Sequence, residues 1–100
     1  MPYIAPEDRP ALDAAIDGLA AAVNEKAAER DGAFEGYLNY AITRLALEVI
    51  PSRRYASIAR VTGVLENVKQ EFYRRYAAPY EDEQIERSGD VYRGPPGRAG

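Results

Sequence analysis

Apolar residues recur at helical spacing from residue 12 onward. The first stripe comprises Leu12, Ile16, Leu19 and Val23. Steps of four, three and four residues place them all on one side of an α-helix. Pro10 suits the first helical position, with Asp8 or Arg9 as the cap, because a proline there loses no required hydrogen bond. The pattern predicts a first helix that begins near Pro10 and is ended by Asp31-Gly32.

A second helix is predicted from Glu35 to Val49, and Pro51 prevents its continuation. Its main apolar stripe comprises Leu38, Ile42, Leu45 and Val49. Nearly opposite lies a second group, which comprises Tyr40, Thr43, Leu47 and Ile50. A helix with two apolar faces is normally covered on both sides. Either the C-terminal segment or another subunit is expected to cover the second face.

The third predicted helix carries a seam with alternating steps of three and four residues, as in a coiled coil. The seam comprises Ile58, Val61, Leu65, Val68 and Phe72. Ser57 is the predicted cap, and the helix is expected to end near Ala77 because Pro79 follows. A short fourth helix is predicted from Tyr80 to Arg87, since acidic residues occupy its first turn.

Together these elements predict an all-α fold, a three-helix antiparallel bundle with a short fourth helix at its C-terminus. Residues 1–9 are interpreted as an N-terminal arm, residues 10–88 as the helical domain and residues 89–100 as a C-terminal segment. The tail from about residue 93 reads RGPPGRAG and is expected to be disordered, because nothing in it larger than Ala or Pro can dock. The two-faced second helix predicts a homo-oligomer.

Composition argues against common kinds of catalysis. The chain has no Cys and no His, so it offers no disulfide, thiol nucleophile, histidine base or zinc site of the usual nitrogen and sulfur type. The carboxylates of residues 81–86 suit a helix N-terminus better than a metal site, because their spacing matches no known binding loop. We expect a non-enzymatic protein with no metal and no cofactor.

The charges are segregated along the chain. Acidic and basic residues number nine and four in residues 1–51, two and six in residues 52–78, and five and three in residues 79–100. The acidic total argues against nucleic acid as a partner. No apolar run approaches the roughly 18 residues that span a bilayer, which predicts a cytoplasmic protein without a membrane partner.

A polar strip on the third helix is the main candidate ligand site. Arg60, Asn67 and Arg74 recur every seven residues. The planar guanidinium group of arginine matches the geometry of phosphate or carboxylate. The candidate anion site therefore consists of these three residues together with Arg44, Arg75 and Tyr73. The alternative is a solvated face with pairs within the helix such as Glu71 with Arg74.

Four sequence blocks carry a resemblance. They are Met1-Pro2-Tyr3-Ile4 with Pro6-Glu7-Asp8-Arg9, residues 36–45 (GYLNYAITRL), residues 71–82 (EFYRR and APYED), and Gly89-Asp90-Val91-Tyr92. With them the chain up to Tyr92 resembles a small family of bacterial and phage proteins of no assigned function. The family usually has Asn where this chain has Ser88, and the tail is an addition. The resemblance implies that residues of these blocks are the ones to test.

The leading hypothesis is a helical binding or assembly module that forms a homo-oligomer. Its interface is predicted at Tyr40, Thr43, Leu47 and Ile50. The alternative is a protein that sequesters or senses a small anionic ligand such as a nucleotide, through the candidate anion site. Binding to a different protein is a further alternative.

Overall fold

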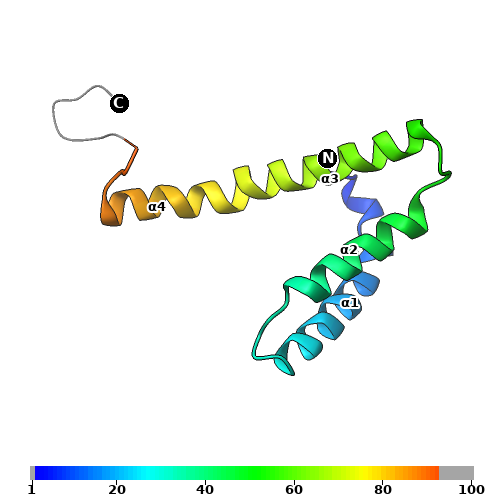
Figure 1. Cartoon of the computed structure of the whole chain (residues 1–100), viewed down its shortest axis with the longest axis horizontal. Coiled ribbons are helices and arrows are strands. Elements are labelled where there is room, and N and C mark those ends of the chain that lie inside the picture. The colour runs from blue at the N-terminus through cyan, green and yellow to red at the C-terminus, as the bar shows by residue number, and fades with distance from the viewer. Residues whose placement is uncertain (1, 93–100) are drawn as a thin grey trace. The chain divides into compact units, whose positions relative to one another are not determined.

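The computed structural model describes residues 2–92, and every regular element within them is helical. A 3₁₀ turn, η1, spans Pro6–Asp8, followed by α1 (Pro10–Ala28), α2 (Glu35–Val49), α3 (Tyr55–Phe72), the π-helical turn η2 (Tyr73–Ala77) and α4 (Ala78–Ser88) (Figure 1). The predicted all-α class is confirmed. The predicted disordered tail lies outside the described residues.

Contacts divide the chain inside α3, between Thr62 and Gly63. Residues 2–62 form one unit, here named the hairpin unit, which holds η1, α1, α2 and the first turns of α3. The described residues from Gly63 to Tyr92 form the C-terminal unit, which holds the rest of α3, η2 and α4.

The predicted bounds of the first two helices are confirmed. α1 begins at Pro10 and α2 spans Glu35–Val49, as the apolar spacing and the prolines predict. Arg9 occupies the N-cap position of α1, although its side chain makes no capping hydrogen bond. Instead its Nε donates to the carbonyl of Ile4 at 3.1 Å, which ties the N-terminal arm to the start of α1.

The turn after α1 explains why the helix ends there. Asp31 and Gly32 both adopt positive φ angles, 57° and 83°. The Gly32 amide donates to the carbonyl of Ala27 at 2.8 Å, five residues back, as in a Schellman motif. This reversal of the backbone direction produces the antiparallel α1–α2 hairpin.

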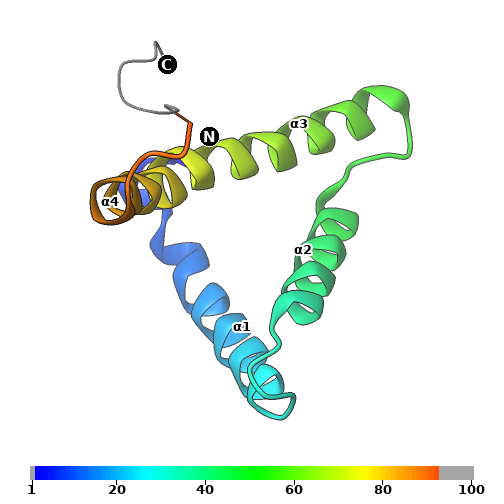
Figure 2. The same cartoon turned by 60° about the vertical axis from the view of Figure 1, so that its left-hand side comes forward.

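The two helices of the hairpin contact each other near the turn and diverge away from it (Figure 2). In these two helices Ala27 is the buried residue, 5% exposed, and Val23, Tyr37 and Ala41 are half-buried. Small side chains let the two backbones approach, but they bury little apolar surface. The larger residues of α1, such as Leu12 and Ile16, stay more than half exposed.

The predicted cap of the third helix is wrong. α3 begins at Tyr55, because the Ile58 amide already donates to the carbonyl of Arg54 at 3.0 Å. Ser57 therefore lies inside the first turn, only 8% exposed. Its hydroxyl is 2.8 Å from that of Ser52, which links the preceding loop to the helix.

The predicted break at Pro79 is also wrong. The chain stays helical through the proline because η2 widens the turn just before it. The amide of Ala78 donates to Tyr73, five residues back, so the hydrogen-bond register shifts before the residue that lacks an amide. In a regular α-helix the Pro79 ring would clash with the carbonyl four residues earlier. The π turn widens the helix at this point and so accommodates the proline.

No helix within residues 2–92 is both long enough and apolar enough to cross a membrane.

Candidate binding surfaces

The larger surface feature of the hairpin unit is a groove of about 970 Å³ along one side of α1 and α2. Its lining is mostly apolar and includes Leu19, Val23, Tyr37 and Ala41. Its lining also includes three cationic side chains, Lys26, Arg30 and Arg44, and one acidic side chain, Glu48. We call it the basic-rimmed groove, because apolar residues together with a net positive charge suit a molecule that is partly apolar and partly anionic.

Two of the three rim cations already have partners. Lys26 lies 3.4 Å from Glu29, and Arg44 lies 3.6 Å from Glu48. Arg44 also donates to the Tyr40 hydroxyl at 3.2 Å, and its guanidinium lies 5.9 Å from the Tyr40 ring centre. The bond to Tyr40 raises the pKa of Arg44, so its charge is secure at any ordinary pH.

Arg30 is the rim cation without an ion-pair partner among residues 2–92. It follows the end of α1, where a cation also interacts well with the carbonyl end of the helix. The guanidinium of Arg30 is therefore available to bind an anionic group. The sequence pattern did not predict Arg30 as a site residue.

A second groove, of about 340 Å³, follows the other side of the hairpin and is almost wholly apolar. Its lining includes the predicted stripes of the first two helices, among them Leu19, Leu38 and Ile42. These three side chains are 42–47% exposed. The stripes that the sequence assigns to a core thus lie at the surface of the hairpin unit.

The predicted interface residues on α2 are largely exposed. Tyr40 and Leu47 are 63% and 66% exposed, and Ile50 is half-buried. Thr43 is exposed and donates to Asn39 at 3.2 Å, one turn earlier. This second face of α2 is apolar and available to a partner.

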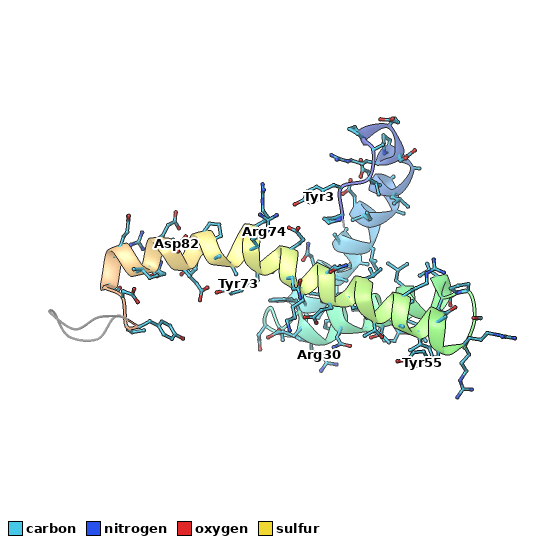
Figure 3. All side chains as sticks on the ribbon, turned by 90° about the horizontal axis from the view of Figure 1, so that it is seen from above. Tyr3, Arg30, Tyr55, Tyr73, Arg74 and Asp82 are labelled. Carbon is cyan, nitrogen blue, oxygen red and sulfur yellow. The ribbon has the colours of Figure 1, made fainter. Side chains whose placement is uncertain are left out.

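The predicted anion residues are divided between the two units. Arg44 and Arg60 belong to the hairpin unit, and Asn67, Tyr73, Arg74 and Arg75 to the C-terminal unit. Arg74 is held by both carboxylate oxygens of Glu71, at 3.3 and 3.1 Å. Tyr73 and Arg74 leave the helix on different sides (Figure 3), so these two side chains do not converge on one ligand.

The Tyr73 hydroxyl donates to Glu81 at 2.6 Å. This bond, together with the negative charge of Glu81, raises the pKa of Tyr73. Sequence spacing could not reveal the contact, because residues eight apart are rotated by about 80° around a regular α-helix. The intervening π turn removes that rotation.

An exposed line of apolar residues follows the C-terminal unit from α3 into α4. It comprises Leu65, Val68, Phe72, Tyr76 and Tyr80, and we call it the aromatic seam. These side chains are 42–72% exposed. The rings of Phe72 and Tyr76 stack, with centres 5.1 Å apart and planes 18° apart. The sequence predicted the part in α3 but not its extension through the π turn.

Within residues 2–92 no group of three or more acidic side chains is arranged to hold a metal ion. Nor is any buried side-chain nitrogen or oxygen in that range left without a hydrogen-bond partner. No unpaired polar group thus marks a cofactor position in the described part of the chain.

These features define a small all-helical protein whose apolar stripes lie on its surface. The chain belongs to the family described as a domain of unknown function, DUF6899, which matches residues 1–91. No curated protein and no solved structure matches it. The resemblance to a family without an assigned function is therefore confirmed, and the chemistry has to be argued from the surfaces themselves.

Proposed function

We propose that this protein is a non-enzymatic helical assembly module that forms a homo-oligomer. The observation that carries the proposal is the scarcity of buried side chains. Among the described residues only Ala27 and Ser57 are buried, at 5% and 8% exposure. Helices of this length take most of their stability from packing an apolar face. Each large apolar side chain gains about 1.5–3 kcal/mol when fully buried, so these stripes favour a covering partner.

A second copy of the chain supplies surfaces of the required kind. The hairpin carries apolar grooves on both sides, and α2 has a further face at Tyr40, Thr43, Leu47 and Ile50. The proposed arrangement is a three-helix antiparallel bundle in each subunit, to which α3 contributes Ile58 and Val61 from the hairpin unit. The second face of α2 is then buried between subunits.

A charge placed on the second face of α2 tests the proposal. We expect Leu47→Glu to give a smaller particle than the unaltered protein in native mass spectrometry, because a carboxylate at a buried apolar contact is costly. Ala21→Glu is the matched control, since it adds the same charge to α1 at an exposed position opposite the apolar stripe.

Circular dichroism should show that both variants keep their helices. A Leu47→Glu variant with the same mass and the same midpoint of unfolding as Ala21→Glu would reject this interface. A monomeric unaltered protein at every accessible concentration would reject assembly altogether.

A second candidate function rests on the basic-rimmed groove. Arg30 has no ion-pair partner among residues 2–92, and it lines the groove with Lys26 and Arg44 beside mostly apolar residues. A small organic anion with a flat or apolar body, such as a nucleotide, fits this chemistry.

Thermal unfolding with a panel of nucleotides and other organic anions tests this candidate. A true ligand at a hundredfold excess over its Kd stabilises the fold by about 2.7 kcal/mol. The shift should disappear in Arg30→Ala but persist in Arg53→Ala, which removes a cation from the loop before α3. Absence of any shift across the panel would reject the nucleotide version.

A further inference from the structure

The described helices of the C-terminal unit follow one another without a break from Gly63 to Ser88. Within this unit no second helix packs beside them to cover an apolar side. The aromatic seam runs along this helix, and Phe72, Tyr76 and Tyr80 are each at least 60% exposed. A single helix with an uncovered apolar seam gains little stability in water, so the seam calls for a partner helix.

The π turn keeps the seam on one side of the helix. In a regular α-helix Tyr80 would lie about 80° around the axis from Phe72, eight residues earlier. The bond between Tyr73 and Glu81, also eight residues apart, shows that η2 removes this rotation. The rings of Phe72 and Tyr76, four residues apart, stack as neighbours along the seam. The seam therefore extends straight from α3 into α4.

The charges of this helix differ before and after the π turn. Lys69, Arg74 and Arg75 lie on the N-terminal side of Ala77, and α4 carries Glu81, Asp82, Glu83 and Glu86. Lys69 and Arg74 pair with acidic residues one turn earlier, at 3.6 and 3.1 Å. Arg75, Glu83 and Glu86 have no ion-pair partner among residues 2–92. Residues 63–77 carry three basic and two acidic residues, and α4 carries four acidic and one basic. The helix thus has a basic half, in which Arg75 is unpaired within the described residues, and a more strongly acidic half.

We propose that this helix pairs antiparallel with the same helix of a second copy, seam against seam. The pairing places the basic half, Lys69–Arg75, of each copy beside the acidic half, Glu81–Glu86, of the other. A parallel pair would instead set like charges side by side. The hairpin unit, with nine acidic and seven basic residues, is a poorer partner for the acidic α4 than the basic half of a second copy is. This inference rests on the proposed function and adds a second interface to it.

Charge reversal in each half tests the pairing in the full chain. One variant combines Lys69→Glu with Arg75→Glu, and the other combines Glu83→Lys with Glu86→Lys. Each should assemble at least tenfold more weakly by itself, measured by analytical ultracentrifugation, since like charges then meet at both ends of the pair. An equimolar mixture of the two should recover the assembly as a one-to-one hetero-pair, which native mass spectrometry resolves by mass.

Asp13→Lys with Asp17→Lys is the control, because it makes the same charge change as the acidic-half variant on exposed positions of α1. It should assemble like the unaltered protein. If the charge-reversed variants assemble normally, or if their mixture recovers nothing, the helix pairing is wrong while the proposed assembly at α2 stands. If the unaltered protein is monomeric throughout, both are wrong.

A distance measurement covers the case in which charge reversal unfolds the helix. The chain has no cysteine, so single spin labels can be attached at Glu66→Cys and Ala77→Cys without background. At about 1.5 Å per residue, an antiparallel pair centred near the π turn separates the two labels at position 66 by about 30 Å. The two labels at position 77 should be much closer. Equal short distances at both positions would mean a parallel pair, and no short distance at position 77 would mean no pair.

Discussion

At the scale of single residues, the most specific local contact is the bond between Tyr73 and Glu81. The bond and the carboxylate charge raise the pKa of Tyr73 above its usual value of about 10. A group whose pKa is higher in the folded state stabilises the fold at a pH below its unfolded pKa, and that contribution is lost as the pH rises through the folded pKa. The bond therefore acts throughout the neutral range and fails above about pH 10.

We predict that Tyr73 is among the last tyrosines to lose its proton. In a titration followed by ultraviolet absorbance, Tyr73→Phe should remove amplitude from the high-pH end of the curve. Glu81→Gln should move that amplitude to lower pH, because the carboxylate no longer holds the proton in place. Tyr55→Phe is the control, since that side chain is 86% exposed. An identical loss in Tyr73→Phe and Tyr55→Phe would contradict the prediction.

At the scale of elements, the end of α1 is held by two residues with positive φ angles. Asp31 adopts 57° and Gly32 adopts 83°, but only glycine does so without a steric penalty. Asp31 also places a negative charge near the carbonyl end of the helix, where a negative charge is unfavourable.

We therefore predict that Asp31→Gly stabilises the protein by up to about 1 kcal/mol, measured by urea unfolding. Asp17→Gly, in the middle of α1, makes the same chemical change and should destabilise by about 0.3 kcal/mol, because Gly is only slightly less favourable than Asp in a helix interior. Equal effects of the two substitutions would show that the backbone angle at Asp31 does not govern the end of α1.

Local sequence signals predicted the helix bounds correctly where the signal acts within one helical turn. Pro10, Pro51 and Asp31-Gly32 bound the first two helices as predicted. The two errors, at Ser57 and Pro79, concern positions where the backbone had alternatives. Ser52 engages the Ser57 hydroxyl, and a π turn accommodates Pro79. Neither choice can be read from residue type, because each depends on which hydrogen bonds the folded chain makes.

At the scale of the whole molecule, the apolar stripes and the charge segregation belong to the same problem. Side chains such as Leu38 and Leu45 have the spacing of core residues, yet they are 44% and 58% exposed. The basic stretch, residues 52–78, spans both units, and neither its Arg75 nor Glu83 and Glu86 of α4 has an ion-pair partner among residues 2–92. A second copy of the chain can cover the apolar stripes and pair with these charges at the same time. For this reason assembly is the proposed function.

The sequence by itself determined the helical class, most helix bounds, the two apolar faces of α2 and the family. These depend on periodicity and on the backbone limits of Pro and Gly, which act over a few residues. Only the tertiary structure decided that the stripes stay at the surface, that Arg30 joins Lys26 and Arg44 around a groove, and that a π turn aligns the aromatic seam. Those outcomes depend on how far two helices diverge and on one shifted hydrogen bond, and periodicity specifies neither.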